Sequence, residues 1–143
     1  MSKKLTAKAS ITIKADRQMV WKGLTDPKLI KQYFFGTETE SEWKKGSPIV
    51  FRGVWEGKPY EDKGTILDVD PPNFIKYNYW SNFSGTPDIP ENYANITYSL
   101  RSSGNQTHLD VTQDGIATEE ARDHSEKNWI GILDGLKKLL EKA

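Results

Sequence analysis

Residues 118–143, TEEARDHSEKNWIGILDGLKKLLEKA, form the one long helical pattern in this chain. At about 100° per residue, its apolar and small side chains fall on one side. They are Ala121, Ser125, Trp129, Ile132, Leu133, Leu136, Leu139 and Leu140. The C-terminal half of this face consists of Ile and Leu, which predicts a tightly packed core seam. The N-terminal half, with Ala121, Arg122, Ser125 and Trp129, mixes small, polar and aromatic groups, and this favours the lining of a cavity.

The chain before this helix predicts short strands and two short helices. Residues 5–15 alternate between apolar and polar, as a half-buried antiparallel strand does. Asp16 is a favourable N-cap for a short helix that ends at Asp26, and Pro27 opens a second helix that ends near Gly36. Six further strands are predicted at residues 37–43, 47–57, 60–70, 73–80, 93–102 and 106–114. Turn residues such as Lys45-Gly46 separate these strands, which indicates hairpins and an antiparallel sheet.

The order of these elements predicts an α+β fold. A large antiparallel sheet has an apolar face to cover, and the terminal helix is the only predicted element long enough to cover it. We therefore expect a seven-stranded antiparallel sheet curled around the long C-terminal helix, with two short helices between the first two strands. The sequence contains no internal repeat and no linker composition, so residues 1–143 are expected to form one domain.

Composition excludes several classes of partner. Lys plus Arg and Asp plus Glu both number 20, so the formal net charge of zero provides no general attraction to nucleic acid or acidic membranes. The absence of cysteine excludes disulfides, thiolate metal sites and thiol nucleophiles. No apolar run is long enough for a membrane span or a signal peptide, so a cytoplasmic protein without membrane insertion is expected.

Residues 11–34, ITIKADRQMVWKGLTDPKLIKQYF, resemble the opening of the START/Bet v 1-like (SRPBCC) superfamily. Within it, the chain is similar to the branch named for activators of heat-shock protein 90 ATPase. The supporting motifs are Trp43-Lys44-Lys45-Gly46, Lys63-Gly64-Thr65-Ile66, Asp70-Pro71-Pro72, Tyr79-Trp80 and Asn128-Trp129. The resemblance spans nearly the whole chain and implies the helix-grip (Bet v 1-like) fold. Because such motifs are mostly structural, they specify fold better than function.

Catalytic and metal chemistry finds little support in the sequence. The two histidines, His108 and His124, lack a metal-ligand spacing, so neither a metal nor another cofactor is expected. No nucleophile elbow or glycine-rich phosphate loop occurs, and no catalytic residue is assigned. The carboxylate pairs Asp68/Asp70, Glu61/Asp62 and Glu119/Glu120 are interpreted as residues beside turns and at a helix start.

The aromatic residues carry the clearest functional indication. Trp55, Tyr77, Tyr79, Tyr98 and Trp129 are expected between the sheet and the helix. Buried Tyr and Trp need partners for their polar ends, which favours a partly polar pocket; rings that simply fill a wide sheet are the alternative. Four helix residues, Ala121, Arg122, His124 and Ser125, complete the predicted ligand-binding set. Arg122 suits an anionic ligand group or a rim ion pair, and His124 lies near the expected mouth.

Three functions remain open. The leading hypothesis is a non-enzymatic domain that holds a small apolar or amphipathic molecule between sheet and helix, entered near residues 81–92 and the N-terminal end of the long helix. The family resemblance implies an alternative, a module that binds a chaperone and stimulates heat-shock protein 90 ATPase through exposed aromatic groups. For that surface we expect Phe34, Phe35, Tyr60 and Phe83. A second alternative is a cyclase- or dehydratase-type enzyme with an inward polar cluster of Arg122, His124 and Tyr98.

Overall fold

The computed structural model describes residues 5–34, 36–81, 87–116 and 118–141. Its elements in chain order are β1 (Leu5–Ile13), α1 (Arg17–Thr25), α2 (Pro27–Tyr33), β2 (Glu38–Ser41), β3 (Pro48–Trp55), β4 (Lys58–Asp70), β5 (Phe74–Ser81), the short 3₁₀ helix η1 (Pro90–Asn92), β6 (Ala94–Ser103), β7 (Gln106–Ile116) and α3 (Glu119–Glu141). The predicted strands and helices are all present. The predicted α+β helix-grip architecture is therefore confirmed.

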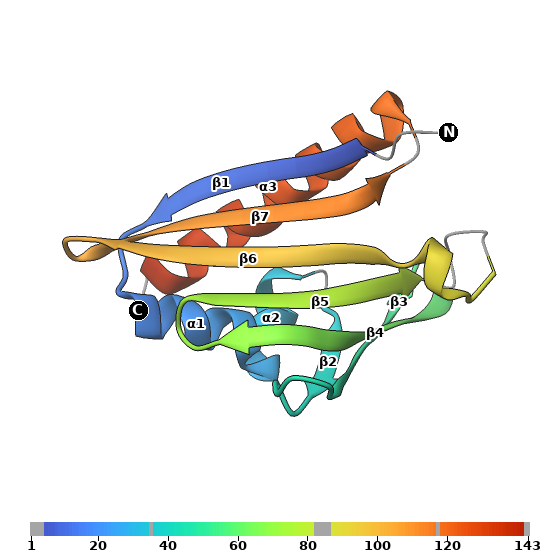
Figure 1. The fold of residues 1–143 in the computed structure, drawn as a ribbon. Coiled ribbons are helices and arrows are strands. Elements are labelled where there is room, and N and C mark those ends of the chain that lie inside the picture. Colours follow the sequence, from blue (N-terminus) through green and yellow to red (C-terminus); the bar gives the residue numbers. More distant parts are fainter. Residues whose placement is uncertain (1–4, 35, 82–86, 117, 142–143) are drawn as a thin grey trace.

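The seven strands form one antiparallel sheet in the order β1-β7-β6-β5-β4-β3-β2. Figure 1 shows α3 running behind β1 and β7, while β5 to β2 continue the sheet below it. The helices α1 and α2, which connect β1 to β2, lie beside the C-terminal end of α3. The C-terminal end of α3 therefore lies against α1 and α2 as well as the sheet.

The C-terminal part of α3 packs into the core. The buried residues of the helix are Trp129, Ile132, Leu133, Leu136 and Leu140. Gly23 of α1 allows a close approach here, because a Cβ atom at that position would lie 2.8 Å from Cδ1 of Leu136. The inward face is narrower than the helical pattern predicted, since Leu139 is half-buried and Ala121 is exposed.

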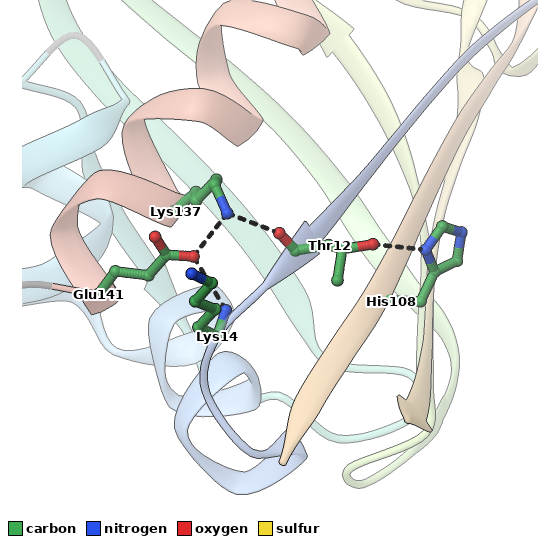
Figure 2. Close-up of polar contacts among 5 residues, drawn as sticks. All are labelled: Thr12, Lys14, His108, Lys137 and Glu141. Atoms are coloured by element: carbon green, nitrogen blue, oxygen red, sulfur yellow. Dashed lines mark hydrogen bonds and ion pairs between the residues drawn. The ribbon is translucent and has the colours of Figure 1, made fainter. Parts of the chain in front are cut away.

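A polar clamp also fastens this end of α3 to β1 (Figure 2). The Lys137 ammonium donates to the Thr12 carbonyl at 2.9 Å and pairs with Glu141 at 2.6 Å. Glu141 accepts a hydrogen bond from the Lys14 backbone N–H at 2.9 Å, while the Thr12 hydroxyl lies 3.2 Å from Nδ1 of His108 on β7. The hydrogen bonds from Lys137 and Lys14 lower the pKa of the Glu141 carboxyl. We call residues 133–141 the anchored half of α3.

No helix within the described ranges is both long and apolar enough to cross a lipid bilayer.

Candidate functional site

A cavity of about 590 Å³ lies between the N-terminal half of α3 and the inner face of the sheet. We call residues 119–132 the cavity half of this helix. The lining residues are Phe34, Thr37, Phe51, Tyr60, Asp62, Tyr77, Tyr79, Ser81, Ile96, Gln113, His124, Ser125, Asn128, Trp129 and Ile132. The strand residues among them project to one face because side chains alternate along a strand. The volume falls within the range of roughly 300–1,000 Å³ that small-molecule sites occupy.

Aromatic rings form one wall of the cavity. Phe34, at the end of α2, stacks on Phe51 of β3 with ring centroids 6.1 Å apart and meets Trp129 edge-on at 6.4 Å. Phe51 also contacts Tyr77, with centroids 5.9 Å apart. The indole N–H of Trp129 donates to Oε1 of Gln113 at 2.9 Å, so the polar end of the indole is satisfied within the protein. The wall is thus held in place by ring contacts and one hydrogen bond.

A carboxyl group, that of Asp62, lies on the sheet side of the cavity. Asp62 on β4 is only 8% exposed and stands opposite Ser81 on β5. The Tyr79 hydroxyl donates to its Oδ2 at 2.6 Å, and Ser81 also hydrogen-bonds to the carboxyl. Oδ1 is buried and has no hydrogen-bond partner among the described residues. Burial raises the pKa of Asp62, and the hydrogen bonds from Ser81 and Tyr79 oppose that rise.

The tyrosine hydroxyls around Asp62 remain protonated donors. Burial raises the pKa of Tyr79, and the neighbouring Asp62 carboxyl raises it further. Burial likewise raises the pKa of Tyr77. The polar edge of the cavity therefore offers neutral hydroxyl groups and one carboxyl.

Tyr60 and Phe34 face the cavity rather than solvent, so their prediction as exposed contact residues is wrong. The Tyr60 hydroxyl hydrogen-bonds to Thr37, and its ring lies over Gly53, where a Cβ atom would come within 2.5 Å of the hydroxyl oxygen. Phe34 is half-buried by its ring contacts. Strand pairing and the end of α2 turn both rings inward. Phe35 and Phe83, the other two residues of that prediction, lie outside the described residues.

Five of the predicted ligand-binding residues line the cavity: Tyr77, Tyr79, His124, Ser125 and Trp129. His124 is exposed, as is Asn128 one turn later, and together they mark the mouth of the cavity. Of the two segments expected at the entrance, the N-terminal half of α3 contributes lining residues, while residues 82–86 of the other lie outside the described residues.

Three other predicted residues, Ala121, Arg122 and Tyr98, are not among the described lining residues. Ala121 is exposed, because the first turn of α3 extends past the cavity, and Arg122 pairs with Asp123 at 3.5 Å. Tyr98 is buried behind the wall, with its ring centroid 5.9 Å from that of Trp129. The side chain of Trp55 lies outside the described residues. Arg122, His124 and Tyr98 therefore form no polar cluster of the kind the enzyme hypothesis requires.

The interpretation of Glu61/Asp62 as a pair beside a turn is wrong for Asp62, which lies within β4 and is buried. The sequence pattern nevertheless indicated that the Asp62 side chain points inward. Asp62 shares strand parity with Tyr60 and with Ile66, a fully buried residue, so the alternation of β4 places a charge on its inward face. In the part of the chain that the structure describes, no group of three or more His, Asp or Glu residues could hold a metal ion.

Comparison with known proteins fits the fold and identifies the family. A family model described as Activator of Hsp90 ATPase homolog 1-like protein matches residues 14–141. The chain belongs to this family. Among curated proteins, none matches the chain significantly.

Solved structures share this fold. ChR145 from Cytophaga hutchinsonii is 44% identical, with a TM-score of 0.87 over 99% of this chain and 97% of that protein. The Aha1 dimer from Colwellia psychrerythraea is 18% identical, with a TM-score of 0.75 over 96% of each chain. CalU16 from Micromonospora echinospora is 18% identical, with a TM-score of 0.73 over 98% of this chain and 86% of that one. Because the last two structures are only 18% identical, they show that this chain shares their fold and nothing more.

Proposed function

We propose that this protein binds a small, mostly apolar molecule in the cavity between α3 and the sheet. The observation that carries the proposal is a cavity of about 590 Å³ walled by Phe34, Phe51, Tyr77 and Trp129. If these rings only filled the sheet, the space between them would be too small for more than a few waters. Instead the rings line a volume typical of ligand sites, and the Asp62 edge supplies a polar group that would orient the guest.

The test is a titration of the purified protein with fatty acids, sterols, flavonoids and aromatic polyketides, followed by tryptophan fluorescence. Trp129 lies in the cavity wall, whereas Trp80 lies outside the cavity lining with the Lys63 ammonium 5.8 Å from its ring centroid. A bound molecule should change the emission of the wild-type protein and of Trp80→Phe, and should change that of Trp129→Phe much less. The proposal fails if calorimetry detects no binding by any compound class.

A second candidate function is stimulation of an Hsp90 ATPase, and family membership is the observation that favours it. The aromatic surface expected for this role does not support it, since Phe34 and Tyr60 face the cavity. The exposed large apolar side chains among the described residues, Met19, Val54, Ile89 and Ile130, come from four separate elements or loops. Adding the protein to a cognate Hsp90 and measuring ATP turnover tests the role; unchanged turnover and no complex on gel filtration would remove it.

A further inference from the structure

Among the described residues, the buried lining of the cavity carries one carboxyl group and no cation. Apart from tyrosines, the ionisable residues of the described lining are Asp62 and His124, and His124 is exposed at the mouth. Within the described ranges, no Lys, Arg or His forms an ion pair with Asp62; its neighbour Lys63 instead pairs with Asp88 at 2.5 Å. A buried carboxylate without a cationic partner is unfavourable unless hydrogen bonds or a bound group compensate it.

The two oxygens of Asp62 are in different situations. Oδ2 accepts the hydrogen bond from Tyr79 at 2.6 Å, so one side of the carboxyl is satisfied by the protein. Oδ1 is buried and lacks a partner among the described residues, although an ionised carboxylate can accept about four hydrogen bonds. A buried acceptor left unsatisfied costs roughly 1–3 kcal/mol. Asp62 lines the cavity, so a charged donor on a guest molecule would offset part of the cost of burying the carboxyl group.

We propose, on the basis of the function proposed above, that the ligand is an apolar amine whose protonated nitrogen donates to the Asp62 carboxyl group while its body packs against Phe51, Tyr77 and Trp129. Charge-assisted hydrogen bonds are stronger than neutral ones, which favours an ammonium over a hydroxyl group at this position. The faces of aromatic rings attract cations as well. An anionic head group is disfavoured because it would face the Asp62 carboxylate, and Arg122, the cation predicted for that purpose, does not line the cavity.

The test compares three probes that share one apolar body: naphthylethylamine, naphthylethanol and naphthylacetate. Calorimetry with the wild-type protein should give an amine affinity at least about tenfold above that of the alcohol, with the carboxylate weakest. In Asp62→Asn the amine should fall to the level of the alcohol, and the alcohol affinity should stay within about twofold, which also shows that the cavity is intact. Asp68→Asn is the matched control: Asp68 lies on the same strand but is exposed, so its removal should leave the order unchanged.

Each other outcome has a defined meaning. If the alcohol binds as tightly as the amine, or if the preference for the amine persists in Asp62→Asn, the cavity binds ligands but Asp62 does not select them, and the inference falls alone. If none of the three probes binds but a compound of the broader panel does, the inference falls alone; if the panel also fails, the proposed function and the inference fall together. A wild-type order in which the alcohol or the carboxylate binds as tightly as the amine overturns the inference without recourse to the variant.

Discussion

The two halves of α3 share one amphipathic pattern but face different surroundings. In the anchored half, Leu136 and Leu140 are buried against α1 and the core. Lys137 binds the Thr12 carbonyl of β1, and Glu141 binds the backbone N–H of Lys14, just after that strand. In the cavity half, Ser125 faces an open volume of about 590 Å³. The difference teaches that helical periodicity identifies an inward face, whereas the opposing element decides whether that face packs or lines a space.

The carboxyl groups near the two halves show the same contrast. Hydrogen bonds from Lys137 and Lys14 lower the pKa of Glu141 in the clamp. Burial raises the pKa of Asp62 in the cavity. The clamp thus favours the charged form of its carboxyl group, whereas burial in the cavity wall disfavours the charged form of Asp62.

Among the substitutions considered, truncation of Leu136 in the anchored half should cause the largest loss of stability. Leu136 is fully buried, so Leu136→Ala should lower the free energy of unfolding by about 2–5 kcal/mol through lost burial and a new void. Ser125→Ala, about three turns earlier on the same helix, should change it by less than about 0.5 kcal/mol. Urea denaturation of both variants measures the difference, and equal losses would show that the two halves do not differ in this way.

Trp129 lies near the end of the cavity half that adjoins the anchored half. Trp129→Phe therefore tests whether one residue contributes to both stability and binding. The substitution removes the hydrogen bond to Gln113, which should reduce the free energy of unfolding by roughly 0.5–1.5 kcal/mol. Ligand affinity should fall too, since the indole forms part of the cavity wall. In a double-mutant cycle with Gln113→Leu, the combined loss should be smaller than the sum of the single losses, because the orphaned acceptor disappears. Strictly additive losses would mean that the bond contributes no stability.

The contrast between the halves also shows what sequence can predict. Alternation, caps and turn residues specified the order of the seven strands and the three α-helices, though not the short 3₁₀ helix η1, because these are local properties of the chain. The outcome at the site was mixed: Tyr77, Tyr79, His124, Ser125 and Trp129 line the cavity, but Arg122 and Ala121 do not. Helical periodicity cannot show that the first turn of α3 extends beyond the cavity, since this depends on where the sheet ends.

The residues that sequence reasoning missed are those defined by contacts between distant segments. Thr37 and Phe34 reach the cavity only because α2 ends beside β3. Asp62 becomes a site residue through its position opposite Ser81 and its bond to Tyr79, 17 residues further along the chain. Its inward parity on β4 was visible in the sequence, but its burial and unpaired oxygen required the three-dimensional structure.

Replacing Asp62 should change the response of stability to pH. Because the folded-state pKa of Asp62 is raised above its ordinary value, its contribution to stability is full below the ordinary pKa and is lost as pH rises through the folded-state pKa. Asp62→Asn cannot ionise, so its stability relative to wild type should increase from acid to neutral pH. Thermal unfolding of both proteins across that range measures the effect. A difference that is constant with pH would show that Asp62 titrates normally.

Glu141 should give the smallest effect, with the opposite sign. Its folded-state pKa is lowered, so its contribution is present above the ordinary carboxyl pKa and is lost as pH falls through the folded-state value. Glu141→Gln should therefore destabilise the protein at neutral pH and approach wild-type stability in acid. The group is near solvent, so salt should weaken the effect, whereas the response of Asp62 should depend little on salt. Thermal unfolding at low and high ionic strength separates the contributions of the two carboxyl groups. If the stability of both variants relative to wild type changes with pH in the same direction, the clamp and the cavity do not have opposite effects on carboxyl ionisation.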